Sequence, residues 1–229
     1  MTDVHDPVLG DLVAANPAAA RILDAYGLDF CCHGDCSLGE ACRAAGLDAV
    51  AVAAAVDALD VVGDTEWTAL DPAALATHIV DTHHAYLHAE LPVLDALAGK
   101  VRAVHAARHP ELDAVGRLVA AVRTELEPHL LKEEHVLFPA IEAIAGGRRD
   151  FPFGSVETPV RIMRFEHDRA GDLLEELRAA TGGYTVPADA CASYRALYER
   201  LEALEEDTHL HILKENHVLF PAVIALFER

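Results

Sequence analysis

Basic side chains are scarce in this chain of 229 residues. Its 18 Lys and Arg are outnumbered by 38 Asp and Glu, which gives a formal net charge of −20 at pH 7. Such an excess of negative charge repels the phosphates of nucleic acids and anionic lipid head groups. We therefore expect neither nucleic acid nor a membrane surface as a partner.

Long apolar runs are also lacking. The longest one near the N-terminus, residues 49–56, is bounded by Asp48 and Asp57 and is far too short to cross a bilayer. The first ten residues have neither the basic stretch nor the apolar core of a secretory signal. We therefore expect a soluble cytoplasmic protein, and its hydrophobic content of 52% is ample for a buried core.

The cysteines do not have the spacing of a disulfide framework. Four of the five, Cys31, Cys32, Cys36 and Cys42, lie within twelve residues of one another, and Cys191 stands alone. A framework would spread its cysteines along the chain. The crowded four are compatible with a cytoplasmic protein, and we interpret Cys191 as structural.

Residues 1–62 are predicted to form a small, separate helical domain. Ser37 followed by Glu40 makes a capping box for a helix that Gly46 ends. Further short helices are expected at residues 8–16, at 17–26 and from Asp48 onward. The loop between the second and third of these helices has the sequence DFCCHGDC.

A linker at residues 63–71 leads to a predicted four-helix bundle over residues 72–229. Asp71 and Pro72 suit the cap and first turn of a long helix. Breaks rich in glycine and proline give four helices, expected at residues 72–105, 110–145, 156–180 and after Pro187, in up-down-up-down order. The interior prolines are Pro92, Pro128 and the repeated pair Pro139 and Pro221. We expect a kink at Pro128, and the repeated pair is expected to shape the far end of each hairpin.

A repeated segment is the most informative feature of the chain. HLLKEEHVLFPAIEAI at residues 129–144 returns as HILKENHVLFPAVIAL at residues 211–226, with 11 of 16 positions identical. Both copies begin His-x-x-x-Glu, and residues i and i+4 of a helix lie on the same face. Each copy therefore points one imidazole and one carboxylate in the same direction.

The repeat extends towards the N-terminus through two single histidines. His84 precedes His129 by 45 residues, and His167 precedes His211 by 44. The bundle thus offers four imidazoles and two carboxylates, from His84, His129, Glu133, His167, His211 and Glu215. Two carboxylates can bridge two cations while two imidazoles bind each cation, which predicts a dinuclear metal centre with open positions. Mixed imidazole and carboxylate ligands favour iron, and zinc is left open.

Other polar residues compete with this set or surround it. His83 competes with His84, although the spacing favours His84, and His88 is a rival because it shares a helix face with His84. Glu166 and Glu125 lie near ligand candidates, where they could orient imidazoles or relay protons, or else lie on a solvated face. The remaining histidines are expected on outer faces: His5, His33, His78, His105, His109, His135, His209 and His217.

Together these motifs closely resemble the repair of iron centres family, the ScdA and YtfE type of di-iron iron-sulfur cluster repair protein. The motifs are DFCCHG at residues 29–34, His84, HLLKE at 129–133, EHD at 166–168 and HILKE at 211–215. The resemblance covers nearly the whole chain. It implies a small cysteine-containing N-terminal domain followed by a hemerythrin-like bundle.

The resemblance also implies a site and a function. The family's ligand pattern falls on the same six residues, with Glu133 and Glu215 bridging two iron ions, and its paired cysteines fall on Cys31 and Cys32. Transient iron binding, electron delivery or reversible pairing with Cys36 are open roles for these thiols, and Cys36 and Cys42 go beyond the family's pattern.

The expected activity is repair of iron-sulfur clusters damaged by nitric oxide or oxidants, through iron donation or nitric oxide reduction of an oxidoreductase type. Damaged iron-sulfur proteins and small ligands such as nitric oxide or oxygen are the implied partners. The alternative is a hemerythrin-like carrier or sensor of oxygen or nitric oxide. The oligomeric state is left open, with a homodimer among the options.

Overall fold

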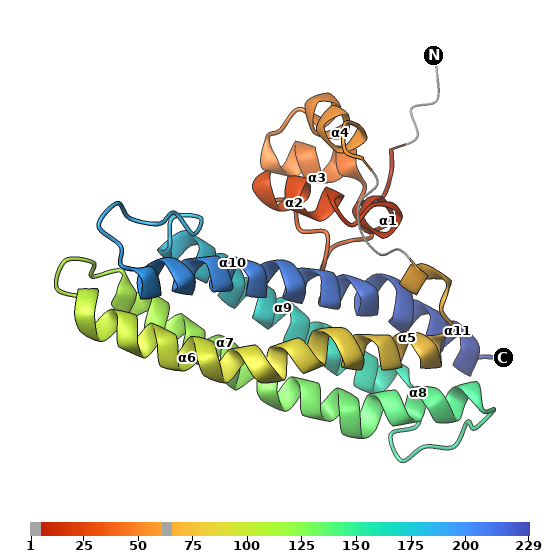
Figure 1. Ribbon diagram of the computed structural model, residues 1–229. Helices are drawn as coiled ribbons and strands as arrows, with labels where there is room; N and C mark the ends of the chain where they lie inside the picture. Colours follow the sequence, from red (N-terminus) through yellow and green to blue (C-terminus); the bar gives the residue numbers. More distant parts are fainter. Residues whose placement is uncertain (1–5, 61–65) are drawn as a thin grey trace.

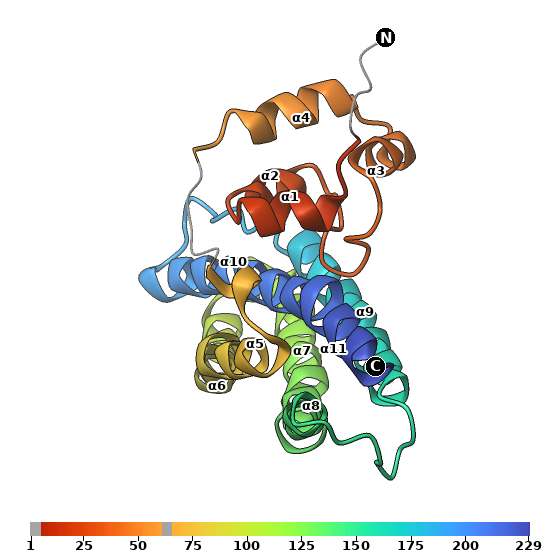
Figure 2. The same cartoon turned by 90° about the vertical axis from the view of Figure 1, so that its right-hand side faces the viewer.

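The computed structural model consists of a layer of four short helices lying across a bundle of long helices (Figures 1 and 2). It describes residues 6–60 and 66–229, and within them there is no β-strand. The predicted all-α fold, a helical bundle with a small N-terminal helical layer, is therefore confirmed. His5 and residues 63–65 of the predicted linker lie outside the described residues.

The short helices are close to their expected positions. They are α1 Leu9–Ala15, α2 Ala19–Ala25, α3 Leu38–Ala45 and α4 Ala49–Asp57, and the short 3₁₀ turn η1 Glu66–Ala69 follows. The Ser37 hydroxyl accepts a hydrogen bond from the backbone N–H of Glu40 at 3.3 Å, and Gly46 has a left-handed φ of 70°. These contacts satisfy backbone groups at both ends of α3, as expected for a capped helix.

Four long helical segments make the bundle. They are α5 Pro72–Ile79 with η2 Val80–His84 and α6 Ala85–His105; α7 Leu112–Lys132 with η3 Glu133–Leu137 and α8 Phe138–Ala145; α9 Glu157–Ala180; and α10 Ala192–Leu213 with η4 Lys214–Leu219 and α11 Phe220–Phe227. In the bundle α6 packs on α7, α7 on α9, α9 on α10, and α10 on α6. This closed order is that of an up-down-up-down bundle.

The helix is not interrupted at Pro128, where we expected a kink. The helix assignment passes through Pro92 and Pro128 without a break, whereas η2, η3 and η4 are π-helical turns. Pro139 and Pro221 are the second residues of α8 and α11, which follow η3 and η4. Because proline cannot donate to the carbonyl four residues back and clashes with it, a wider turn before it relieves the conflict.

Two apolar clusters fill the bundle on either side of a polar layer. One cluster is built from α6, α7, α9 and α10 and includes Leu94, Val119 and Leu201, which are fully buried. The other joins α5, α8, the start of α9 and α11 around Trp67 and Phe220. The ligand candidates lie between the two clusters along every one of the four long helical segments.

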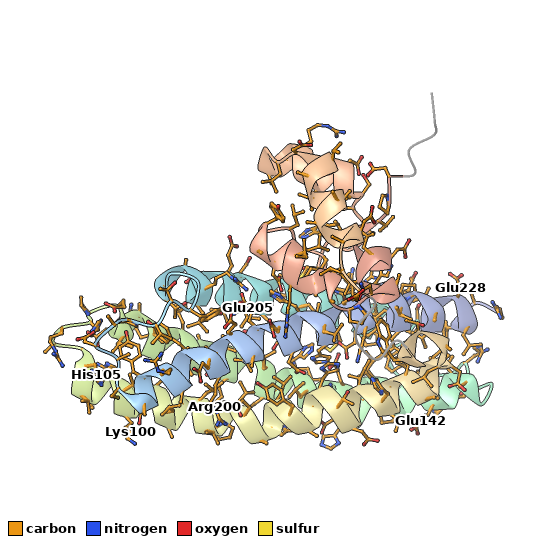
Figure 3. The ribbon with its side chains drawn as sticks, turned by 45° about the horizontal axis from the view of Figure 1, so that its top comes forward. Lys100, His105, Glu142, Arg200, Glu205 and Glu228 are labelled. Carbon is orange, nitrogen blue, oxygen red and sulfur yellow. The ribbon has the colours of Figure 1, made fainter. Side chains whose placement is uncertain are left out.

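Two ion pairs, each between a buried carboxylate and a partly exposed arginine, tie α10 to its neighbours through Glu205 and Arg200 (Figure 3). Glu205 pairs with Arg178 of α9 at 2.7 Å, and Arg200 pairs with Glu90 of α6 at 2.6 Å. Each guanidinium contacts both oxygens of its carboxylate, a geometry that fixes orientation as well as charge. These pairs hold α10, which carries His211, in a defined position against two other helices.

The N-terminal helices pack on α10 through an apolar core of their own. Ile212 and Leu213 of α10 belong to the same buried cluster as Phe30 and Cys42. Gly10 of α1 lies against the ring of His217, and a Cβ atom at Gly10 would come within 2.6 Å of that ring. This close approach requires glycine at residue 10.

The segment Ala192–Phe227 is long and apolar enough to cross a membrane by length and composition alone. It is a helix of the bundle, however, and its buried residues include the polar side chains of Glu205, His211 and Glu215. A core helix of a bundle meets the same criterion, so this segment does not indicate a membrane protein.

Replacing Leu197 with Ala should destabilise the metal-free protein by about 2–5 kcal/mol, because Leu197 is fully buried in the main cluster and its loss leaves a cavity. Val93→Ala is the control, because Val93 is largely exposed on α6. Urea denaturation followed by circular dichroism measures both variants. Equal losses of stability in the two variants would contradict the assigned core.

Candidate metal centre

Six buried side chains converge in the polar layer of the bundle. Their ligand atoms form two groups of four, each with all atoms within 4.8 Å of one another, and the groups share Glu133 and Glu215. The first group is His84, Glu133, His211 and Glu215, and the second is His129, Glu133, His167 and Glu215. The structure therefore brings together all six residues that the hairpin spacing selected.

The four imidazoles face one another through their Nε2 atoms. His84 Nε2 lies 3.2 Å from His211 Nε2, and His129 Nε2 lies 3.1 Å from His167 Nε2. Three of the rings place Nδ1 against an oxygen, so Nδ1 carries a proton and Nε2 points inward. Two Nε2 atoms directed at the same point are the arrangement that a shared cation satisfies, once neither nitrogen carries a proton.

The two carboxylates are the strongest sign of a cation site. Both are completely buried, and Glu133 Oε1 and Oε2 and Glu215 Oε2 have no partner with hydrogen-bond geometry among the described residues. His167 Nε2 lies 3.0 Å from Glu215 Oε2 and His129 Nε2 lies 3.3 Å from Glu133 Oε2, but neither contact has hydrogen-bond geometry. Because a buried carboxylate needs a compensating charge, the donor set fits two metal cations.

Without metal, protons must supply part of that compensation. Although burial acts in the opposite direction, the charges and hydrogen bonds of the neighbouring imidazoles hold the pKa of Glu215 well below its usual range. Burial also opposes charge on His129, yet the Glu133 carboxylate raises the pKa of His129 to about 10. The metal-free site is therefore a network of buried carboxylates and at least one imidazolium.

Three of the four imidazoles are oriented by a hydrogen bond on their outer nitrogen. His129 Nδ1 donates to Glu166 Oε2 at 2.9 Å, and Glu166 also pairs with Lys132. The bond from His129 is the main reason that the pKa of Glu166 falls to about 2. Of the two positions that the sequence left open for Glu166, the structure has the one beside a ligand candidate, which is His129 rather than the adjacent His167.

Sequence reasoning missed the partners of the other two oriented rings. His84 Nδ1 donates to Glu134 Oε1 at 3.0 Å, and His167 Nδ1 donates to Asn216 Oδ1 at 3.0 Å. Glu134 and Asn216 are the residues that follow Glu133 and Glu215, so they occupy equivalent positions of the repeat. That equivalence was the signal that could have found them.

His211 has a different environment from the other three ligand candidates. Its ring stacks on His83 with centroids 5.5 Å apart, and its Nδ1 has no hydrogen-bond partner among the described residues. His83 in turn contacts Asp207 at 2.9 Å and the buried amine of Lys214 at 2.8 Å. His83, which competed with His84 in the sequence, thus lies behind His211 rather than in the ligand groups.

The other two competing residues lie outside the ligand groups. His88 is exposed and its Nε2 contacts Glu134 at 2.8 Å, so it reaches the carboxylate behind His84 and not the centre. Glu125, which we expected near His129, forms an ion pair with Arg169 at 3.0 Å.

The histidines expected on outer faces are not all exposed. His33 and His135 are exposed, as expected, while His78, His109, His209 and His217 are partly buried. His105 was wrongly predicted to lie at the surface: it is buried and contacts Cys191 at 3.1 Å. Helix periodicity alone did not show that α10 covers this end of α6.

The cysteine loop lies on the outer side of α9 and α10. The Sγ atoms of Cys31 and Cys32 are 3.7 Å apart, and Asp29 accepts hydrogen bonds from the backbone N–H groups of both. The hydrogen bond with Cys32, together with burial, raises the pKa of the Cys31 thiol. Asp29, Cys31 and Cys32 form a third group with metal-ligating atoms in reach of one another.

Cys36 and Cys42, the other two cysteines of the N-terminal helices, have different contacts from Cys31 and Cys32. Cys42 is fully buried in the apolar core of the short helices. Cys36 Sγ contacts the Ser37 carbonyl and, at 3.9 Å, the carboxylate of Glu40.

Comparison with known proteins gives two family matches. Residues 75–223 match the hemerythrin HHE cation binding domain, and residues 5–60 match ScdA_N, a domain of unknown function. The iron-sulfur cluster repair protein YtfE of Cronobacter sakazakii is 34% identical over 222 residues, which cover 96% of this chain and 97% of that protein. YtfE of Escherichia coli O157:H7 is 32% identical over 96% of this chain and 98% of its own length.

A third relative is also similar over nearly its whole length. The probable iron-sulfur cluster repair protein of Haemophilus influenzae is 34% identical over 94% of this chain and 96% of its own length. Fold and site thus define a hemerythrin-like, cation-binding helical bundle. The chain belongs to the hemerythrin HHE cation-binding family, in the YtfE type that carries an N-terminal ScdA_N domain, and the resemblance predicted from the motifs is confirmed.

Metal affinity should rise with pH between pH 6 and pH 8. The pKa of His129 is raised to about 10 in the metal-free chain, so its imidazole is protonated across this range and must lose that proton to bind a cation. Each proton released makes the apparent affinity rise roughly tenfold per pH unit. Competition with a chromophoric chelator, corrected for the chelator's own protonation, measures this, and a flat profile would contradict the assignment of His129 as a ligand.

Glu166→Gln should weaken metal binding by about 10- to 100-fold, the usual cost of losing the group that orients a ligand histidine. Glu125→Gln is the matched control, because Glu125 pairs with Arg169 and not with a ligand candidate. Isothermal titration of the metal-free variants with ferrous iron under anaerobic conditions compares them. Equal affinities of the two variants would show that Glu166 does not orient His129.

Proposed function

We propose that this chain is a di-iron protein that repairs iron-sulfur clusters damaged by nitric oxide or oxidants. The observation that carries the proposal is a pair of buried donor groups sharing Glu133 and Glu215, placed beneath a loop with two adjacent thiols. The names of the relatives, which are iron-sulfur cluster repair proteins, support it. The partners are then damaged iron-sulfur proteins.

Iron is the metal that this donor set favours. Each group offers two imidazole nitrogens and two carboxylates, with no thiolate, and a thiolate-rich set would have favoured zinc. Four protein residues per ion leave coordination positions open to small molecules. Two iron ions bound here would supply one-electron chemistry and positions for ligands such as nitric oxide or oxygen.

The protein's own residues prepare the site for this chemistry. Glu133 and Glu215 supply the negative charge that holds two cations close together, and they are fully buried. Glu134, Glu166 and Asn216 keep three imidazoles turned inward. The apolar clusters on both sides keep bulk water out, which strengthens every electrostatic contact inside.

The thiols of Cys31 and Cys32 suit the temporary holding of iron outside the bundle. They share a small cluster with Asp29 and lie at a cleft of about 220 Å³ that is also lined by α9 residues such as Asp168 and Glu175. The acidic walls attract a cation, and thiolates bind ferrous iron once their protons leave. A simple carrier of oxygen or nitric oxide has no need of this docked loop, so its presence favours repair.

The iron-loaded protein should restore activity to an enzyme whose iron-sulfur cluster has been damaged by nitric oxide. Anaerobic incubation of the two proteins, followed by an assay of the cluster enzyme and electron paramagnetic resonance of its cluster, measures the recovery. The same amount of free ferrous iron with a small thiol sets the background. Recovery no faster than this background would favour the carrier function.

Two sets of variants test which residues bind iron and which residues repair also requires. Glu133→Ala should lose bound iron and repair together, whereas Glu142→Ala should keep both because Glu142 lies on the exposed face of α8 (Figure 3). Full retention of two irons by Glu133→Ala would overturn its bridging role.

The double variant Cys31→Ser, Cys32→Ser should keep both irons but slow repair, since the thiols lie outside the two ligand groups of the bundle.

A further inference from the structure

The two copies of the repeat differ at the residue that follows the shared carboxylate. The first copy has Glu134 there and the second has Asn216. Both side chains orient a ligand histidine. Glu134 accepts a hydrogen bond from His84 Nδ1, and Asn216 accepts one from His167 Nδ1, each at 3.0 Å. Orientation of the ligand histidine therefore does not explain why one residue is an acid and the other an amide.

The difference is explained by a second contact that only Asn216 makes. Its Nδ2 donates a hydrogen bond to the backbone carbonyl of Cys31 at 3.2 Å. An ionised carboxylate has no proton to donate, so a glutamate or aspartate could not bond to this carbonyl. An amide serves both contacts, with its oxygen on the ligand histidine and its nitrogen on the cysteine loop.

Other residues of the second copy also contact the N-terminal helices. Leu213 is completely buried there, whereas its counterpart Leu131 in the first copy is 47% exposed. His217 bonds to Asp11 at 2.9 Å, whereas its counterpart His135 is exposed. The exchange of acid for amide thus occurs in the copy that contacts the N-terminal layer.

We propose that Asn216 is a positioning residue that couples the cysteine loop to the metal centre. A cation bound by His167 fixes the His167 ring, the ring fixes the Asn216 amide, and the amide holds the Cys31 carbonyl. Docking of the loop and binding of the cation therefore stabilise each other, since coupling between two sites is reciprocal. This rests on the proposed function only in that a cation binds at His167, and not on repair of clusters.

The coupling predicts that cation binding protects the thiols. Cys31 is buried and Cys32 is partly buried when the loop is docked, so Cys31 reacts only when the loop moves away from α10, and Cys32 becomes more accessible at the same time. A cation at the centre should favour the docked loop and slow their alkylation. Release of the cation should speed it.

Asn216→Asp separates the two contacts of the amide. It keeps an oxygen for His167, as Glu134 does for His84, and removes the donor to Cys31. We expect Asn216→Asp still to bind zinc, and more tightly than Asn216→Ala does, while the difference in thiol alkylation between zinc-loaded and metal-free protein disappears. Asn216→Ala loses both contacts, so its zinc affinity should also fall by about 10- to 100-fold.

The experiment alkylates each full-length variant with iodoacetamide, with and without two equivalents of zinc, and follows Cys31 and Cys32 by peptide mass spectrometry. Glu134→Gln is the matched control, because it changes the equivalent residue of the copy that does not contact the loop and should leave alkylation unchanged. Circular dichroism checks that each variant is folded. Zinc affinity is measured separately by chelator competition.

Two outcomes would overturn the proposal. One is an Asn216→Asp protein whose thiols zinc still protects as strongly as in the original protein, which would also assign the protection to zinc held by the thiols themselves. The other is an original protein whose thiols react at one rate with and without zinc while zinc is bound. Failure of the original protein to bind zinc or iron in the bundle would instead contradict the proposed function.

Discussion

The structure depends on the burial of two carboxylates inside an otherwise apolar bundle. Glu133 and Glu215 are both 0% exposed, and a charge removed from water in this way requires an opposite charge within a few ångströms. The four imidazoles, and the cations that they can help to bind, meet that requirement. The apolar clusters above and below then become an advantage, because they keep the compensating charges from being screened by water.

The surroundings of the centre depart from the symmetry of its ligands. Behind His129 lies the acid Glu166 with Lys132, whereas behind His211 lies the imidazole of His83 with Lys214. The ring of His129 therefore has a carboxylate next to it, whereas the ring of His211 has a stacked imidazole beside a buried amine. Two cations bound by the two ligand groups would therefore have different environments, even though Glu133 and Glu215 belong to both groups.

The sequence was sufficient for the fold class and for which six residues meet, because both follow from the spacing of residues on helices and from an internal repeat. It was not sufficient for the contacts around them. Glu134 and Asn216 were missed because their role depends on how helices are placed next to each other, and His105 was misjudged for the same reason. Glu125 lies one turn before His129 in sequence, yet Arg169 of another helix takes its carboxylate.

The π-helical turns place one extra residue in three of the long segments, at the level of the ligand candidates. Glu133 and Glu215 lie within η3 and η4, and η2 ends at His84. Because a π turn holds about one residue more than an α turn, deleting one residue from it would restore regular helix and leave the helix beyond nearly in phase. Deleting one residue from the regular helix just before the turn would instead rotate everything beyond it by about 100°, and would turn the buried rings of Phe138 and Phe220 away from the core. Within these helices, the three turns are therefore where the loss of a residue disturbs the packing beyond it least.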